Sequence, residues 1–399
     1  MLFYLDTLFM IDNKLFAELV TIRRQLHQHP ELGFKEFKTS ALVQEHLQGL
    51  AIPFETIVET GVIATLKKGE GPVIVLRADM DALPIQEGTD FDFHSVNEGV
   101  MHACGHDLHT TMLLGAAYQL KNMEFEGTVK LVFQPSEEGN ARSPQKGKSG
   151  GQIIVESGKL DDAKASLGLH VHPLLPVGKL GYRNGESLAN VSNFSIRVNG
   201  KGGHPGAMEH VIDPVMISGH LIVAAQSLIS HTAPTEPAVI AFTHVQSLAD
   251  PSFNVIPQTV LMQGSLRVLN IDTYQKLVEK LKDLIKGMEI SFGCQIELDF
   301  SAYYPSLLND EGIHEKLGEV QNQLFGKANV FEGAAQLIGE DFSFYSRLMP
   351  SHFYFLGAKT DQNDSYFLHH PKVTFNEECM KYGSAFLAEG AVALINSFK

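Results

Sequence analysis

The sequence has no tryptophan and only three cysteines among its 399 residues. Cys104, Cys294 and Cys379 are too few for a disulfide framework, which fits a reducing compartment, and we expect a cytoplasmic protein. Basic residues are also scarce: 31 Lys and Arg stand against 46 Asp and Glu, giving a formal net charge of −15. With no basic patch evident, we expect neither nucleic acid nor an anionic membrane as a partner.

Long apolar runs are lacking as well. No segment has uninterrupted apolar residues over the length that a membrane helix needs. The first fourteen residues are apolar but lack a basic flank and contain Asp6, so an ordinary helix or strand is expected there rather than a signal peptide. The composition, 44% hydrophobic and 19% charged, is typical of a globular protein, and the length favours two domains.

The most informative stretch covers residues 101–117, MHACGHDLHTTMLLGAA. Cys104 and His106 are residue types that bind borderline-soft divalent metals. Residues two apart do not share a helix face, so this pair can converge on one ion only from a turn, where Gly105 permits a bend. The apolar residues that follow recur at helical spacing and predict a buried helix. The alternative interpretation is a free core cysteine among the histidines at a helix entrance, which here are His102, His106 and His109.

Strands and helices alternate in the first half of the chain, which predicts an α/β domain. Residues 14–50 are expected to form two helices broken at Pro30. Polar residues follow the predicted strands, at the edge where sites form in open α/β sheets. The strands themselves are predicted from short apolar runs at residues 62–66, 73–76, 129–133 and 165–171.

The middle of the chain has the order β-α-β-β-α-β of the ferredoxin-like motif. We therefore expect an inserted domain at residues 186–297. Residues 1–185 together with 298–399 then form the metal-binding catalytic domain, so that His369 can return to the site of Cys104. The inserted elements are predicted at residues 194–198, 213–230, 238–245, 259–269, 277–288 and 294–300.

Seven short motifs occur in one order: ADMDALP, MHACGHDLHTTMLLGAA, QPSEEG, GLHV, GKGGH, GEDF and LHHP. In this order they resemble the M20-type metallopeptidase and amidohydrolase family. The nearest branch comprises hippurate hydrolases, N-acyl-amino-acid deacylases and auxin-conjugate hydrolases. The resemblance covers nearly the whole chain, and the seven motifs together are specific although each alone is weak. It implies a mixed-sheet catalytic domain of the zinc-peptidase type with an inserted ferredoxin-like α+β domain for dimerisation or as a lid.

The resemblance also implies a centre of two divalent ions. At the matching positions, the ligands are Cys104, His106, Glu138, His170 and His369. Two neighbouring histidines, His172 and His370, are the ones that could be exchanged with members of this set. A donor set of one Cys, one Glu and three His admits Zn, Mn, Co or Ni, so the native metal stays open.

Glu137 takes the family's general-base role. Adjacent residues leaving a strand point to opposite sides, so Glu138 can bind metal while Glu137 faces a water. The hypothesis is that Glu137 takes the proton of a metal-activated water and later delivers it to the leaving amine. The alternative interpretation of Glu137 is an electrostatic partner of an Arg or Lys, but no basic residue lies beside it in sequence.

His204 matches a histidine that stabilises the oxyanion in relatives, often in the site of a partner subunit. The family usually places a second His five residues later, but here His210 is six residues on, which leaves the position of the His204 ring open. A surface loop histidine is the alternative. Asp79 stands where distant relatives carry a metal-binding His, so we do not expect it to be a ligand. Asp81 matches an Asp that orients a ligand or the base.

Asn254 and Arg267 lie where related enzymes recognise the substrate carboxylate, and Arg suits that bidentate contact. A structural salt bridge is an equal alternative for Arg267. The combined prediction is a metal-dependent amidohydrolase of N-acyl amino acids, acting as a homodimer through the inserted domain. The alternatives are a dipeptidase or aminopeptidase of the same superfamily, or a non-catalytic binding paralogue. The acyl group and the amino acid are not determined by the sequence.

Overall fold

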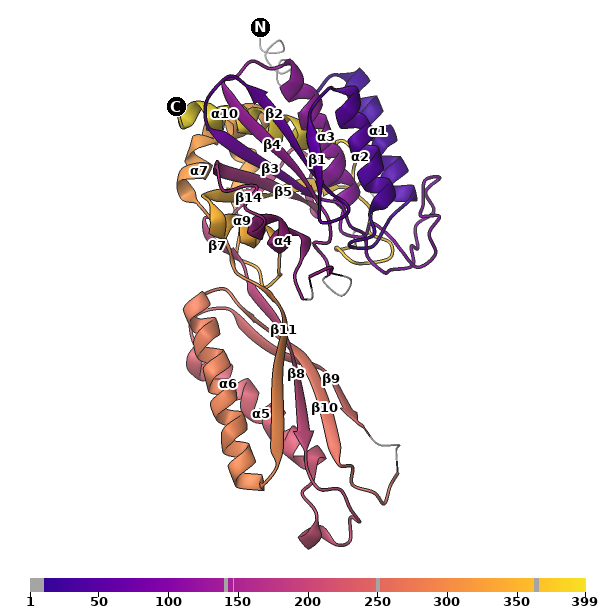
Figure 1. Cartoon of the computed structure of the whole chain (residues 1–399), viewed down its shortest axis with the longest axis vertical. Helices are drawn as coiled ribbons and strands as arrows, with labels where there is room; N and C mark the ends of the chain where they lie inside the picture. Colours follow the sequence, from indigo (N-terminus) through magenta and orange to yellow (C-terminus); the bar gives the residue numbers. More distant parts are fainter. Residues whose placement is uncertain (1–10, 140–142, 146, 249–251, 362–365) are drawn as a thin grey trace. The chain divides into compact units, whose positions relative to one another are not determined.

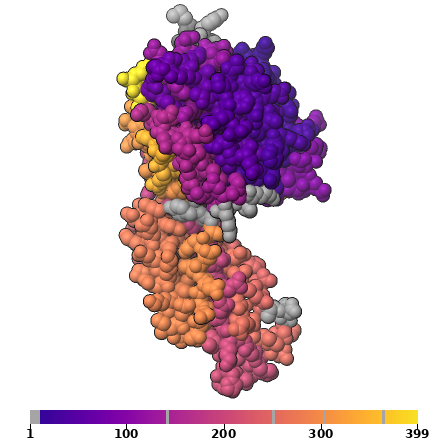
Figure 2. Space-filling model, viewed as in Figure 1, coloured from indigo at the N-terminus to yellow at the C-terminus, as the bar shows by residue number. Residues whose placement is uncertain are grey.

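The computed structural model describes residues 11–139, 143–145, 147–248, 252–361 and 366–399. The expectation of a helix or strand rather than a signal peptide at the start of the chain therefore falls mostly outside the described residues. The chain divides into two compact units. The first comprises residues 1–185, 308–334 and 341–399, and the second comprises residues 186–307 and 335–340. Figures 1 and 2 show the first unit formed from both ends of the chain, indigo and yellow.

The first unit contains a mixed sheet of eight strands. Its central strands β4, β3, β5 and β14 are mutually parallel, so their carboxyl ends meet at one edge. This confirms the predicted mixed-sheet α/β fold. In spatial order the strands are β1 (Phe54–Ile57), β2 (Gly61–Lys68), β4 (Gly127–Gln134), β3 (Val73–Asp79), β5 (Ala163–Pro176), β14 (Ser351–Lys359), β6 (Leu180–Tyr182) and β13 (Val330–Glu332).

Helices cover both faces of this sheet. On β5, the missing side chain of Gly168 leaves room for Phe342 of α9 (Phe342–Leu348), while the next residue towards the amino end, Leu167, lies against Gly390 of α10 (Cys379–Ser397). Neighbouring strand residues point to opposite faces, so α9 and α10 lie on opposite sides. The α10 side also carries α3 (His106–Asn122), α1 (Asn13–Gln28) and α2 (Phe37–Gly49).

Local chemistry fixes where the first two helices begin. The carboxylate of Asp12 accepts the backbone N–H of Leu15 and caps α1. At the start of α2, Glu31 accepts the backbone N–H groups of Lys38 and Thr39. The two helices are separate, as the break at Pro30 predicts.

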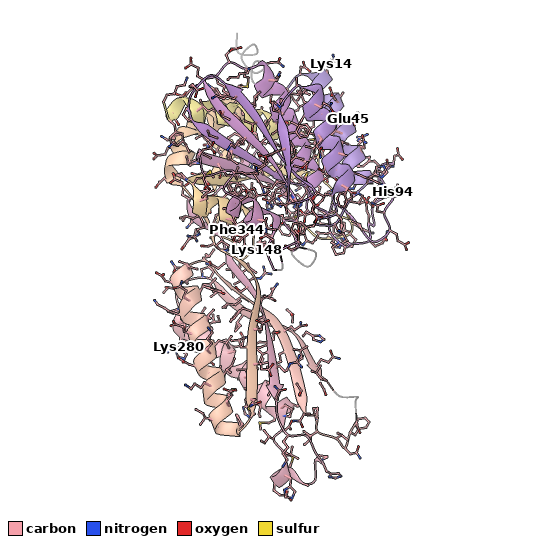
Figure 3. The ribbon with its side chains drawn as sticks, in the orientation of Figure 1. Lys14, Glu45, His94, Lys148, Lys280 and Phe344 are labelled. Carbon is pink, nitrogen blue, oxygen red and sulfur yellow. The ribbon has the colours of Figure 1, made fainter. Side chains whose placement is uncertain are left out.

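The second unit has the predicted order β-α-β-β-α-β, and its sheet has the spatial order β11-β8-β10-β9. Asp213 and Asn270 cap the two helices at their amino ends, and Gly293 ends the second with φ of 66°. Figure 3 shows Lys280 on the outer face of the second helix. The elements are β8 (Asn190–Asn199), α5 (Pro214–Thr232), β9 (Ala238–Ser247), β10 (Thr259–Val268), α6 (Ile271–Phe292) and β11 (Gln295–Tyr304).

One of the described helices, α5, is long and apolar enough by length and composition to cross a membrane. Its apolar residues are interrupted by His220 and Gln226. Ile217 and Leu221 belong to the buried core of the second unit. Only 22% of the tested window is buried, and a single helix that passes this test is weak evidence for a membrane span.

The expected second boundary of the insert, between residues 297 and 298, falls inside β11, so the second unit continues to residue 307. Residues 335–340 also belong to it, because the backbone of Ala189 donates to Ile338 and that of Gln336 donates to Ser187. β7 and β12 pair in a two-stranded sheet. The remaining elements are α4 (Gly150–Glu156), β7 (Gly185–Leu188), η1 (Met208–His210), β12 (Leu307–Asn309), α7 (Glu311–Lys316), α8 (Gly318–Phe325) and η2 (Lys327–Asn329).

Candidate metal centre

Cys104 and His106 are placed by a left-handed turn at the entrance of α3. Gly105 is the N-cap residue and has φ of 88°, a conformation that favours glycine. A Cβ atom at this position would also collide with the side chain of Val171. Both the backbone conformation and the lack of space for a Cβ atom therefore require glycine here. The turn places the Cys104 thiol next to the His106 imidazole, as the sequence predicts.

Three other predicted ligands surround the Cys104 thiol. The Nε2 atoms of His170 and His369 each lie 3.4 Å from its Sγ atom. His369 Nε2 also lies 2.9 Å from a carboxylate oxygen of Glu138. His369 has φ of 65°, an uncommon conformation for a residue with a side chain, and strain of this kind concentrates at functional sites.

The five predicted ligands form two groups that share Cys104. Each group has its ligand atoms within 4.8 Å of one another. Of the paired histidines, it is His170 and His369 that belong to these groups. Within the described part of the chain, His172 and His370 belong to none. The two groups are Cys104, His106 and His170, and Cys104, Glu138 and His369.

The donor atoms of these residues fit divalent metal ions. Thiolate, imidazole and carboxylate together suit a borderline-soft divalent cation. The Nε2 atom of His106 is buried and has no hydrogen-bond partner among the residues that the structure describes. A buried polar atom without a partner is costly, and a metal ion is one group that would satisfy it.

The electrostatics of the pocket favour positive charge. Burial raises the pKa of the Cys104 thiol well above its ordinary value, and the carboxylates of Glu138 and Glu137 raise it further. Burial alone would lower the pKa of His106, but Asp79 and Asp81 outweigh it and raise that pKa to about 10. A cation bound here would therefore replace protons and hold Cys104 as the thiolate.

Asp81 contacts both the base segment and a ligand. One carboxylate oxygen accepts the backbone N–H of Glu137 at 3.0 Å and the other accepts that of Glu138 at 2.9 Å. The first oxygen also lies 3.2 Å from Nδ1 of His106. Asp81 thus contacts the backbone of the predicted base and the ring of one predicted ligand, and its role in orienting either stays a prediction.

Asp79 makes close contacts with other buried side chains, and it also forms a group with His106 and His109 whose ligand atoms lie within 4.8 Å of one another. Its exclusion from the ligand set stays a prediction. Asp79 accepts a hydrogen bond from His109 Nδ1 at 2.6 Å, and Arg77 forms an ion pair with it at 2.6 Å. The backbone N–H of Val171 donates to the other ring nitrogen of His109 at 2.9 Å, so this ring is neutral. Arg77 also pairs with Asp341 at 2.7 Å.

The turn that carries Glu137 has a buried support that the sequence does not reveal. Ser136 has φ of 47°, and its backbone N–H donates to Glu36 at 2.8 Å. The hydroxyl of Thr60 donates to the other oxygen of Glu36 at 2.6 Å. Burial raises the pKa of Glu36 to about 7, and the nearby Asp81 carboxylate adds to the shift.

A second buried network, also missed from the sequence, holds the entrance of α3. Asp107 lies 2.9 Å from Arg23 and 2.7 Å from Nδ1 of His27. The other ring nitrogen of His27 lies 3.1 Å from Glu87. Burial and Arg23 lower the pKa of His27, but Asp107 and Glu87 outweigh them and raise it. The sequence signal was a charged pair, RR, in α1, which by itself indicates only a solvated face.

The remaining predicted residues belong to the second unit and are described within it. His204 is exposed, and its Nδ1 accepts the backbone N–H of Gly206 at 3.0 Å. Asn254 is exposed and accepts a hydrogen bond from Ser252. Arg267 is half-buried and donates to the backbone oxygen of Leu337 at 2.9 Å, rather than forming a salt bridge among the described residues.

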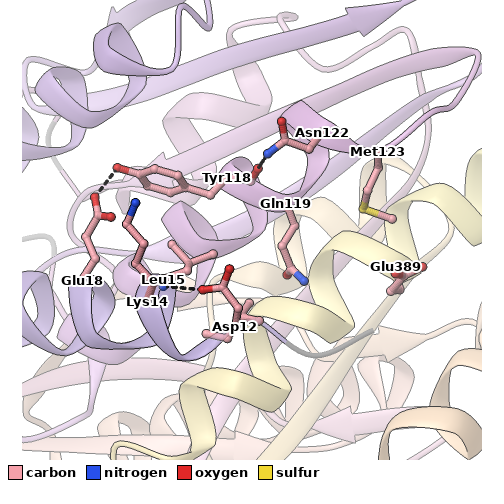
Figure 4. A pocket seen from close by; sticks show the side chains of 10 residues that line it. Asp12, Lys14, Leu15, Glu18, Tyr118, Gln119, Asn122, Met123 and Glu389 are labelled. Carbon is pink, nitrogen blue, oxygen red and sulfur yellow. Dashed lines mark hydrogen bonds between the residues drawn. The ribbon is translucent and has the colours of Figure 1, made fainter. Parts of the chain in front are cut away.

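A hollow of about 540 Å³ lies elsewhere in the first unit (Figure 4). It is lined by residues of the start of α1 and the end of α3, including Glu18, Tyr118 and Met123. Tyr118 follows His106 by twelve residues of helix, which corresponds to roughly 18 Å along the axis. The hollow is therefore separate from the candidate metal centre.

Comparisons with known proteins identify the family of the chain. The sequence profile of Peptidase family M20/M25/M40 matches residues 75–392. The chain is 36% identical to the IAA-amino acid hydrolase ILR1-like 4 of Arabidopsis thaliana, over 97% of this chain and 88% of that protein. It is also 36% identical to the N-acetylcysteine deacetylase of Bacillus subtilis (strain 168), over 98% of this chain and 100% of that protein.

A solved structure gives the same picture. The Bacillus subtilis YXEP protein, described as a dinuclear metal binding peptidase from the M20 family, superposes with a TM-score of 0.82 and 34% identity. The alignment covers 96% of this chain and 99% of that one. The fold thus has a counterpart in a protein described as dinuclear metal binding.

Proposed function

The chain belongs to peptidase family M20/M25/M40 and is an amide-bond hydrolase, and from this premise we propose that it removes the acyl group of N-acyl amino acids. The observation that carries the proposal is the pair of ligand groups that share Cys104, with the buried carboxylate of Glu137 beside them. A group of His106, Glu137 and Glu138 has its ligand atoms within 4.8 Å of one another, so a base lies within reach of the centre.

We propose that Cys104, His106, Glu138, His170 and His369 hold two divalent ions per subunit, drawn from Zn, Mn, Co or Ni. Such ions polarise a carbonyl oxygen and lower the pKa of an attacking water. The shared thiol is the one ligand of the five that lies in both groups. Cys104 is therefore the residue that would contribute to both groups if ions were bound.

In the proposed reaction, Glu137 accepts a proton from the water whose oxygen attacks the acyl carbon. When the bond from this carbon to nitrogen breaks, Glu137 returns that proton to the leaving amine. Asp81 holds the backbone of Glu137 in place through two N–H groups of the turn. In the same proposal His204 stabilises the oxyanion, while Asn254 and Arg267 bind the substrate carboxylate.

The experiment is a substrate panel assayed with metal-loaded protein. It comprises N-acetyl, N-benzoyl and indole-acyl amino acids together with unblocked dipeptides. We expect cleavage of the blocked amino acids, and a loss of roughly 10²- to 10⁴-fold in kcat for Glu137→Ala. Glu45→Ala is the matched control, because Glu45 is an exposed carboxylate on α2 (Figure 3).

Other outcomes would point to the alternatives. Cleavage of dipeptides alone would replace the deacylase by a dipeptidase or aminopeptidase. If protein that contains metal hydrolyses none of the substrates, a non-catalytic binding paralogue would be favoured. Retention of full activity in Glu137→Ala would remove Glu137 from the general-base role.

A homodimer through the second unit is also part of the proposal, in the cytoplasm. β9 is an edge strand of its sheet and leaves Val239 and Val245 exposed. On α5, Val215, Met216 and Val223 are exposed as well. Unpaired strand edges and apolar patches are typical association surfaces. Analytical ultracentrifugation should give a mass near twice 43.9 kDa, and a monomer would contradict this point.

A further inference from the structure

Three aromatic side chains form a surface beside two of the metal ligands in the first unit. We call His172, Phe355 and Phe367 the aromatic wall. The rings of His172 and Phe367 lie 5.6 Å apart at 65°, and those of His172 and Phe355 lie 6.3 Å apart at 87°. These are edge-to-face contacts, which hold aromatic rings in defined positions.

The aromatic wall is attached directly to the candidate metal centre. His172 follows the ligand His170 by two residues on β5, so both side chains point to the same face of the sheet. Phe355 pairs with His170 across β14 and β5, with ring centroids 6.5 Å apart. Phe367 precedes the ligand His369 by two residues. An acyl carbon held at the ligands therefore has the aromatic wall as a neighbour.

The aromatic wall opens towards solvent at one end. Phe353, two residues before Phe355 on β14, is 1% exposed and contacts Phe342 in the core. Phe355 is half-buried, and Phe367 is 42% exposed. A single exposed phenylalanine is ordinary on a protein surface. One that continues a buried aromatic stripe next to a metal centre provides an apolar surface where a substrate binds.

We propose that the aromatic wall is the acyl-binding surface and that it selects a flat aromatic acyl group. This inference rests on the proposed deacylase function. An aromatic acyl group can stack on Phe367 or meet its edge, whereas an acetyl group is too small to cover the exposed ring. The relatives leave the choice open, since one is named for N-acetylcysteine and another for IAA-amino acids.

The kinetic test compares N-benzoyl and N-acetyl derivatives of the same amino acid. In Phe367→Ala, the ratio of kcat/KM for benzoyl over acetyl should fall about threefold to tenfold relative to wild type, mainly through KM. Phe367→Leu, which keeps an apolar side chain, should fall less. Phe37→Ala is the matched control, because Phe37 is 53% exposed on α2 and lies outside the aromatic wall.

Two results would overturn the inference. One is an unchanged ratio in Phe367→Ala. The other is a Phe367→Ala variant whose kcat/KM falls equally for benzoyl and acetyl substrates but falls differently for glycine and leucine derivatives. That result would assign the aromatic wall to the amino-acid side chain.

A binding measurement separates this inference from the proposed function. Calorimetric titration of metal-loaded Glu137→Ala with N-benzoylglycine and N-acetylglycine reports affinity without turnover. We expect the benzoyl compound to bind more tightly, and this preference to disappear when Phe367→Ala is added to Glu137→Ala. Such a result supports acyl binding at the aromatic wall even if the wild type hydrolyses no N-acyl amino acid. Equal affinity for the two compounds would overturn the proposal that the aromatic wall binds the acyl group, while the proposed deacylation would still stand.

Discussion

The carboxylate of Glu36 supports the turn that carries Glu137, although the two lie about 100 residues apart in the sequence. It accepts the backbone N–H of Ser136, the residue before Glu137. Ser136 also packs against Gly33, where a Cβ atom would collide with it. The position of Glu137 thus depends on the loop between α1 and α2 as well as on its own strand.

The raised pKa of Glu36 predicts a pH-dependent stability. Its pKa is about 7 in the folded protein and 4.5 in its ordinary state, so between these values the folded protein holds one more proton than the unfolded chain. The contribution of Glu36 to stability is therefore present below pH 4.5 and is lost as pH rises through 7. The side chain of Gln is neutral at every pH. The unfolding free energy of Glu36→Gln should therefore fall less between pH 5 and pH 8 than that of the wild type, as measured by urea unfolding at both pH values.

The control for this measurement is Glu45→Gln, which changes an exposed carboxylate on α2. It should follow the wild-type pH dependence. An identical pH dependence for Glu36→Gln and wild type would show that the folded-state pKa of Glu36 is ordinary.

Residue contacts of this kind could not be predicted from the sequence. The candidate ligands Cys104 and His106 lie in a dense motif whose residue types themselves point to metal binding, whereas Glu138 is implied by the family resemblance. Glu36 lies in the loop just before α2 and His27 lies in the last turn of α1. They meet their partners only after folding, across 100 and 80 positions. Local pattern carries no information on such pairs.

At the scale of elements, the turn before α3 determines whether the ligands meet. Gly105→Ala places a side chain at φ of 88° and against Val171. We expect a loss of roughly 1–3 kcal/mol in unfolding free energy, together with a loss of bound metal. Chemical unfolding and metal analysis of the purified variant measure the two effects.

Gly287→Ala provides the matched control. Gly287 lies inside α6, and a Cβ atom there would meet nothing within 4 Å. This substitution should stabilise the protein by about 0.5–1 kcal/mol, because glycine is unfavourable in a helix interior. Equal effects of the two substitutions would contradict the role of the turn.

His27 joins α1 to the first turn of α3 through Asp107 and reaches Glu87 in the loop after β3. Its raised pKa means that its contribution to stability is complete at low pH and is lost as pH rises through the folded-state value. His27→Gln should therefore cost roughly 2–4 kcal/mol at pH 6 and less at pH 9. Thermal and urea unfolding at both pH values give the comparison.

For His27→Gln the control is His231→Gln, an exposed position on α5, with an expected change within about 0.5 kcal/mol. A cost that grows with pH would reverse the assigned sign. A negligible cost would show that Arg23 alone satisfies Asp107.

The long periodic elements were predictable, and the short ones were not. The helices α1, α2, α5 and α6 follow from apolar spacing that extends over several turns, and the strands β2 to β5 follow from short apolar runs. β6, β12 and β13 have three residues each, too few to show a period. Each is defined by its pairing after folding: β6 with β14, β13 with β6, and β12 with β7.

For the whole molecule, metal binding concerns the first unit alone, since all five candidate ligands belong to it. Chelation should therefore raise hydrogen exchange in the first turn of α3 and around β5, while α6 and β10 stay protected. Hydrogen–deuterium exchange with mass spectrometry, with and without chelator, tests this. Equal loss of protection in both units would show that they unfold together.

The division into a first unit built from both ends of the chain and an inserted second unit was predictable from the change in the order of strands and helices. The boundary between them was not. β11 continues past residue 298, and residues 335–340 return to the second unit through backbone hydrogen bonds. Such bonds involve no particular side chain and leave no mark in the sequence.

The central claim is that Cys104 is shared by two metal sites that also depend on His170 and His369. The most direct measurement is the number of metal ions per chain, determined by elemental analysis after reconstitution. We predict two ions for the wild type, about one each for His170→Ala and His369→Ala, and fewer than one for Cys104→Ala. Two ions retained by folded Cys104→Ala would contradict the account.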